Sequence, residues 1–167
     1  QVGDHDIANK TLVGRCERCE ASAQKALSLH FDWSNQKVAS SRAGSAAKST
    51  NNNIDTTISS IATNLNTIER SPLEPEHAER AAALKNEFFS GGVAHLTQLP
   101  FTEQYTAVQE LVARLNGEFA DDVEALGLTF LVRQLAGLNE KFGEQISVRN
   151  QPERVTWDQV SAAEAVA

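Results

Sequence analysis

The sequence predicts an all-α protein: an antiparallel bundle of four to five helices, with one long helix over about residues 36–70 and a short C-terminal tail. Ala, Leu, Glu and Gln are abundant whereas Gly, Pro and Tyr are sparse, and this composition favours helix over sheet. Apolar residues also recur at spacings of three and four, the pattern of amphipathic helices. Because such stripes must be buried against one another, we expect residues 1–150 to form one bundle domain and residues 151–167 a tail.

The first helical candidate covers residues 6–33. Its packing stripe is made of Leu12, Cys16, Cys19, Ala23, Ala26, Leu27 and His30. Spacings of three and four place these residues on one face of a helix. The pattern breaks at Trp33, and we expect Ser34 or Asn35 to cap a second helix.

The second candidate is the long helix over residues 36–70. Its heptad-like seam consists of Ile54, Ile58, Ile61, Leu65 and Ile68 and continues backwards through Asn51, Ala47 and Gly44. Small residues permit close approach of another helix, so Gly44, Ala47, Asn51 and Ile54 are the predicted interaction face. The alternative is a break at the polar tract 49–53, whose helix propensity is poor.

The third helix is expected to start in a capping box that opens with Ser71 and Pro72, and to end near Phe89. Gly91 and Gly92 interrupt the helical pattern, and residues 93–99 have room for one or two helical turns before Pro100.

Thr102 is expected to open a fourth helix that ends at Gly127, and Thr129 to cap a fifth that ends near Arg149. The stripe of the fourth helix is Val108, Leu111, Val112, Leu115, Phe119 and Val123, and that of the fifth is Leu131, Leu135, Leu138, Phe142 and Ile146. Thr156 and Gln159 match a second capping box, so the tail is expected either to dock a short helix through Trp157 and Val160 or to fray.

Charge and hydropathy exclude two classes of partner. The net charge is −7 and no Lys/Arg cluster stands out, so we expect no binding to nucleic acid. The apolar runs fall far short of the roughly 20 residues of a membrane span. The chain starts at Gln1, contains no Met and shows no signal-peptide pattern, so a processed or secreted form stays open. Two cysteines that we expect to be reduced favour a cytoplasmic protein.

Cys16 and Cys19 are the candidate metal or redox residues. His5 and His30 each lie eleven residues from the nearer cysteine, which on a continuous helix is about 16 Å and too far for one ion. A redox pair is typically found at a helix N-terminus, whereas these cysteines lie in mid-helix. The favoured interpretation is structural: both thiols reduced, more than half buried and turned toward other helices, with no ion between them.

The remaining polar clusters are interpreted as structural. His77 lies among glutamates in the first turn of the third helix, and residues 118–124 form the densest acidic group. The sequence contains one Glu-x-x-His, formed by Glu74 and His77, whereas a carboxylate-bridged metal site in a bundle needs this motif on two helices. We expect no catalytic residue, no cofactor and no metal site beyond the cysteine alternative.

Three short motifs carry a family resemblance: Phe88-Phe-Ser-Gly-Gly-Val93, Ala125-Leu-Gly-Leu128 and Leu138-Asn-Glu-Lys-Phe-Gly143 followed by Arg149. They resemble segments of an uncharacterised all-helical bacterial protein family of unknown function, over about residues 78–149. The resemblance implies a helical fold and brings no catalytic residue with it.

The expected function is non-enzymatic. We expect a helical-bundle protein that acts through protein–protein contacts, with a protein partner or a second copy, as a structural or adaptor component of a larger assembly. One alternative is a metal-binding or thiol-redox protein that uses Cys16 and Cys19. Another is a bundle that binds a small apolar ligand, which the fold allows but no residue pattern marks.

Overall fold

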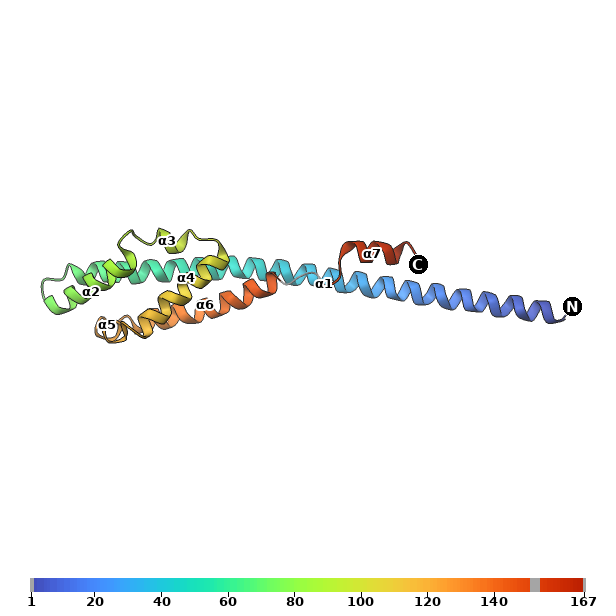
Figure 1. Cartoon of the computed structure of the whole chain (residues 1–167), viewed down its shortest axis with the longest axis horizontal. Helices are drawn as coiled ribbons and strands as arrows, with labels where there is room; N and C mark the ends of the chain where they lie inside the picture. Colours follow the sequence, from blue (N-terminus) through green and yellow to red (C-terminus); the bar gives the residue numbers. More distant parts are fainter. Residues whose placement is uncertain (1, 151–153, 167) are drawn as a thin grey trace. The chain divides into compact units, whose positions relative to one another are not determined.

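A computed structural model describes residues 2–150 and 154–166, with side chains from residue 12 onward. Seven helices occur in this part of the chain, and they are α1 (Val2–Glu69), α2 (Pro75–Phe89), α3 (Ala94–Thr97), α4 (Phe101–Asn116), α5 (Ala120–Ala125), α6 (Thr129–Arg149) and α7 (Trp157–Glu164) (Figure 1). The described ranges contain no strand, which confirms the predicted all-α class.

The chain divides into two compact units. Residues 43–149 form what we call the core unit, and residues 1–42 together with 150–167 form the terminal unit. The helix α1 contributes its second half to the core unit and its first half to the terminal unit. The two compact units do not test the predicted boundary between a bundle domain and a tail at residue 150, so this boundary stays a prediction.

The predicted break between the first two helices is wrong, because α1 continues through Ser34 and Asn35. Contacts with the C-terminal segment hold the helix here: the Trp33 ring lies 4.9 Å from the Trp157 ring, and Gln36 Oε1 accepts a hydrogen bond from the Arg154 backbone N–H at 3.1 Å. Tertiary contacts of this kind outweigh the modest helix propensity of Ser and Asn.

The predicted long helix over residues 36–70 is confirmed as part of α1, and the polar tract 49–53 does not interrupt it. Its polar side chains bond within the helix. Asn51 Nδ2 donates to Asp55 Oδ2 at 3.2 Å, and the Thr56 and Thr57 hydroxyls donate to carbonyls four residues earlier at 2.8 Å. These hydrogen bonds lie within the helix and so do not compete with its backbone bonds.

The core unit buries one continuous apolar cluster. Successive long helices, α1, α2, α4 and α6, run in alternating directions in Figure 1. Fully or almost fully buried side chains from these helices are Ile54, Ile58, Ile61, Leu65, Leu84, Val108, Leu111, Leu115, Val132, Leu135 and Phe142. Each such side chain stabilises the fold by roughly 1.5–3 kcal/mol relative to exposure. All three predicted stripes of the core unit thus contribute to its interior.

Helix α2 starts three residues later than the predicted capping box. It begins at Pro75, and the N-cap Glu74 makes no side-chain capping hydrogen bond. Proline suits the first helical position because its fixed φ is helical and its missing N–H would have no partner there. The end at Phe89 is as predicted, and Gly92 adopts a positive φ of 84° in the turn that follows.

The predicted helix from Thr102 to Gly127 is two helices. The helix α4 starts at Phe101 and ends at Asn116, and α5 follows a turn at residues 117–119. Gly117 weakens the helix here, and the Phe119 ring packs on the Phe88 ring at 5.2 Å. Gly127 ends α5 with φ of 69° and the Leu128 N–H bonds the Val123 carbonyl, a Schellman-type end.

The capping box of the tail is confirmed. Thr156 Oγ1 accepts from the Gln159 N–H at 3.4 Å, and Gln159 Oε1 accepts from the Thr156 N–H at 3.0 Å. These reciprocal bonds open α7, which docks within the terminal unit through the fully buried side chain of Val160.

Candidate functional site

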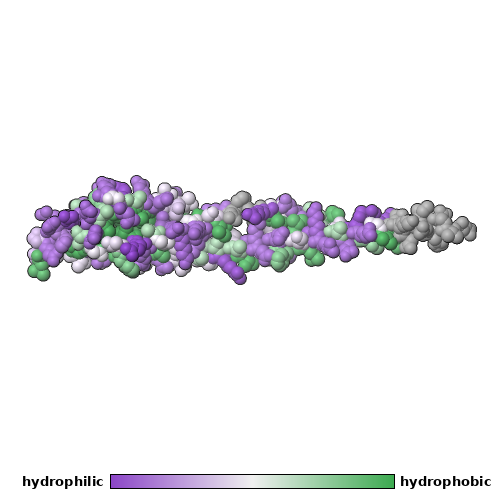
Figure 2. Space-filling view, turned by 90° about the horizontal axis from the view of Figure 1, so that it is seen from below, coloured by the Kyte–Doolittle hydropathy of each residue, from purple (hydrophilic) through white to green (hydrophobic). Residues whose placement is uncertain are grey.

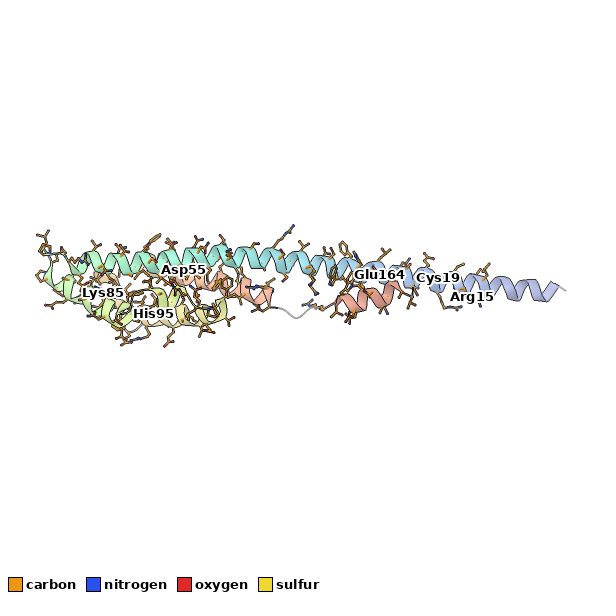
Figure 3. All side chains as sticks on the ribbon, turned by 90° about the horizontal axis from the view of Figure 1, so that it is seen from above. Arg15, Cys19, Asp55, Lys85, His95 and Glu164 are labelled. Atoms are coloured by element: carbon orange, nitrogen blue, oxygen red, sulfur yellow. The ribbon has the colours of Figure 1, made fainter. Side chains whose placement is uncertain are left out.

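The two cysteines do not lie on a packing face. Cys16 and Cys19 are exposed free thiols, so the prediction that both are more than half buried is wrong. Helix α7 reaches only part of the first half of α1, and Figure 3 places Cys19 on the stretch beyond it. A stripe is buried only where another helix covers it, and among the described residues none does so here.

No metal site is formed at the cysteines from the side chains that the structure describes. Across this part of the chain, no group of three or more His, Cys, Asp or Glu side chains is arranged to hold an ion. The side chain of His5 lies outside the described residues. His30 contacts Trp33 and Trp157, with ring centroids 6.1 and 6.5 Å away, and so has a packing role.

The four residues of the predicted interaction face lie within the chain's own packing. Ala47 and Ile54 are fully buried in the core unit. A Cβ added to Gly44 would lie 4.0 Å from Cδ of Arg149, and Asn51 bonds Asp55. At Gly44 the neighbour within the chain is Arg149 of α6, and a contact of these four residues with a partner stays a prediction.

A polar centre is buried between α1 and α4. Asp55 accepts hydrogen bonds from Asn51 Nδ2 at 3.2 Å and from Gln104 Nε2 at 2.6 Å, and Gln104 is fully buried. Burial raises the pKa of Asp55, and the Gln104 hydrogen bond offsets part of that rise. The side-chain oxygens of Asn51 and Gln104 are buried without a protein partner. This centre links two helices through hydrogen bonds, so it suits a role in fixing helix register.

Ion pairs neutralise part of the acidic surface of the core unit. Arg80 bonds Asp122 at 2.7 Å, and Arg114 bonds Glu87 at 2.7 Å and Glu118 at 3.0 Å. Two members of the acidic group at residues 118–124 are therefore paired with arginines, as expected of a solvated helical face.

An exposed apolar surface lies on the first half of α1. Val13, Leu27, Phe31 and Val38 are 51%, 70%, 66% and 45% exposed, and we call them the apolar stripe of α1. At about 100° per residue, the four side chains leave the helix within about 40° of one another. Figure 2 shows green apolar patches between hydrophilic ones on this part of the chain.

The apolar stripe lies mostly on the side of α1 away from α7, and Leu27, at its near edge, shares a hollow with Glu164 of α7. Ala26 is buried, and Trp33 contacts Trp157 of α7. Both leave α1 more than about 100° around the helix from the centre of the stripe. No described helix covers the stripe within the terminal unit, so α1 presents one covered and one uncovered apolar side there.

The sequence analysis predicts neither the apolar stripe nor the burial of Gln104, although residue spacing indicates both. Leu27, Phe31 and Val38 follow each other at spacings of four and seven, but spacings of three and four also connect Leu27 to the predicted packing stripe. Gln104 is one turn before Val108 and thus occupies a core position of its helix.

Comparison with known proteins identifies the family of this chain. In the described ranges, no helix is both long and apolar enough to cross a membrane. Neither the curated proteins nor the solved structures contain a significant match. The family of unknown function DUF6261 matches residues 46–165, a range that includes the three motifs and all helices of the core unit after α1. The chain therefore belongs to DUF6261, which confirms the predicted membership of a helical family of unknown function.

Proposed function

We propose that this protein acts through protein–protein contacts, as a structural or adaptor component of a larger assembly, and that the apolar stripe of α1 is its contact surface. The observation that carries the proposal is the alignment of four exposed apolar side chains, Val13, Leu27, Phe31 and Val38, on one side of a helix. Single exposed apolar residues are normal on a protein surface, but an aligned set of large ones is typical of an interaction site.

A helix is the occupant that fits such a stripe. Apolar residues at spacings of four and seven are the anchors used when one helix packs along another. Helix α7 shows how α1 receives a helix on its other side, with Val160 fully buried and Trp157 against Trp33. Each large apolar side chain that a partner covers contributes up to roughly 1.5–3 kcal/mol before the cost of association.

The surrounding surface favours protein over other partners. The chain carries a net charge of −7, and Glu17 and Glu20 lie on the same side of α1 as the stripe. Negative charge beside an apolar stripe repels phosphate backbones and anionic lipid. The partner is therefore a protein helix or a second copy of this chain.

Site-specific crosslinking tests the proposal. A photoreactive phenylalanine analogue replaces Phe31 in one protein and Phe130 in another; Phe130 is 70% exposed on α6, similar to 66% for Phe31. We expect a crosslinked protein adduct from position 31 and none from position 130. Light scattering on the purified chain then distinguishes a second copy from a different partner.

A substitution pair completes the test. Leu27→Ser removes a neighbouring apolar anchor and is expected to abolish the adduct from position 31. Leu73→Ser, at an 86% exposed position outside the stripe, should leave that adduct intact. A protein that is monomeric at all concentrations and gives equal crosslinking at positions 31 and 130 would refute the proposal.

A further inference from the structure

A groove runs along one flank of α7 in the terminal unit. It has a volume of about 530 Å³ and lies between residues 22–29 of α1 and residues 154–166. Its apolar wall includes Leu29, Val155, Ala163 and Val166. Because α1 and α7 form the two sides of this groove, its shape is that of the valley between two packed helices.

Positive charge borders the groove. Lys25 of α1 and Arg154, before α7, both line it, and no carboxylate of the described residues does. Neither cation forms an ion pair with a residue in the described ranges. Arg18 lies two turns of α1 before Lys25 and leaves the helix on the same side. Asp32 lies two turns after Lys25 on that side as well, so the positive charge of the groove comes from Lys25 and Arg154, which line it directly.

The opposite flank of α7 has a different character. Glu164, in the last turn of α7 (Figure 3), lines the hollow on that side together with Ala26, Leu27 and His30. The positive groove and the hollow beside Glu164 are therefore distinct surfaces. Electrostatic attraction steers an acidic segment to the positive groove and away from the hollow beside Glu164.

We infer that the groove binds an acidic amphipathic helix of a partner protein, as a third helix beside α1 and α7. Helix α7 is itself the precedent for this chemistry. It carries Asp158 and Glu164 and no basic residue, and it packs on α1 through the fully buried Val160. A second acidic helix with a similar apolar side would bury Leu29 and Val166 and pair with Lys25 and Arg154. This contact uses none of the residues of the apolar stripe.

Two labelled helical peptides test the inference, one built from Leu, Ala and Glu heptads and one with Lys in place of Glu. Fluorescence anisotropy measures their binding to the full chain. We expect the acidic peptide to bind, the basic peptide to bind at least about tenfold more weakly, and binding of the acidic peptide to weaken as salt is added.

Charge reversal locates the contact. Lys25→Glu and Arg154→Glu should each weaken binding of the acidic peptide by about 1.5- to 5-fold, and the double variant should favour the basic peptide. Lys141→Glu, at an exposed position on α6, is the matched control and should change neither affinity. Phe31→Ser should also leave peptide binding unchanged, which separates this groove from the apolar stripe.

Three outcomes would overturn the inference. The first is equal affinity for the acidic and basic peptides. The second is an equal effect of Lys25→Glu and Lys141→Glu. The third is binding of vesicles of anionic lipid that competes with the acidic peptide and is lost in the Lys25→Glu variant, since the groove would then belong to a membrane surface.

Discussion

The crossing of α4 and α6 yields the sharpest prediction, because two glycines on α6 differ in what surrounds them. A Cβ added to Gly143 would lie 2.6 Å from Cε2 and 2.9 Å from Cζ of Tyr105, whereas a Cβ added to Gly137 would meet nothing within 4 Å. Carbon atoms in contact are normally about 3.5–4.0 Å apart. Alanine at position 143 therefore requires the Tyr105 ring to move by about 1 Å.

The Tyr105 backbone cannot follow the ring freely. Asn139 Nδ2, one turn before Gly143 on α6, donates to the Tyr105 carbonyl at 3.1 Å, and Asn139 is buried. Overpacking at such a site costs about 1–3 kcal/mol. The higher helix propensity of Ala than of Gly offsets about 0.5–1 kcal/mol of this overpacking cost. Gly143→Ala should thus lower the free energy of unfolding by up to about 2.5 kcal/mol, and Gly137→Ala should raise it by about 0.5–1 kcal/mol.

Urea denaturation followed by far-UV circular dichroism measures both changes, with the slope against urea checked for constancy. Tyr105→Ala, which removes the ring, should eliminate the penalty of Gly143→Ala in a double-mutant cycle. The close packing of α4 on α6 would be refuted if Gly143→Ala were as stable as Gly137→Ala, or if the penalty persisted without the Tyr105 ring.

Three further predictions follow from individual residues. Val160→Ala removes about two buried methylene equivalents, worth roughly 1.5–2 kcal/mol, and should partly undock α7. Tryptophan emission should then shift to the red. Val166→Ala, at an exposed position, should leave the emission unchanged. Burial raises the pKa of Asp55 above its ordinary value of 3.8, so the folded state binds this proton more tightly than the unfolded state. The stabilisation from protonated Asp55 is fully present below pH 3.8 and is lost as pH rises through the raised pKa of Asp55. Asp55→Asn should therefore flatten this part of the curve of unfolding free energy against pH. Identical curves for the two proteins would contradict the prediction. Gly127→Ala should destabilise the protein by about 1 kcal/mol at its φ of 69°, and Gly127→Asn by less, as measured by thermal unfolding.

Periodicity predicted much of the helical core because burial follows local spacing. Leu111 and Leu135 occupy core positions that recur at three and four, and both are buried. Helix ends were harder. Ser34 and Asn35 are good caps in isolation, yet packing of Trp33 on Trp157 keeps them inside α1. That contact joins segments more than 120 residues apart, and local sequence holds no information about it.

The surface features were less predictable for a related reason. Spacing tells which side of a helix an apolar residue shares with others, but not whether a second helix lies on that side. Cys16 and Cys19 share a predicted stripe with Ala26, yet only Ala26 is buried. The groove that Lys25 and Arg154 line depends in the same way on where α7 docks. Its positive character becomes visible only when two distant segments are brought together.

The near contact of Gly44 with Arg149 has a consequence for the order of events during synthesis. The hydrogen bond between Gln36 and Arg154 closes a loop of 118 residues in an unfolded chain. Once residues 43–149 have folded, Gly44 and Arg149 are already neighbours, and only about a dozen residues remain to be closed. The entropic cost of closure then falls by about 2 kcal/mol. The first half of α1 emerges from the ribosome long before α7, so it must wait for the rest of the chain to fold before its covering helix arrives.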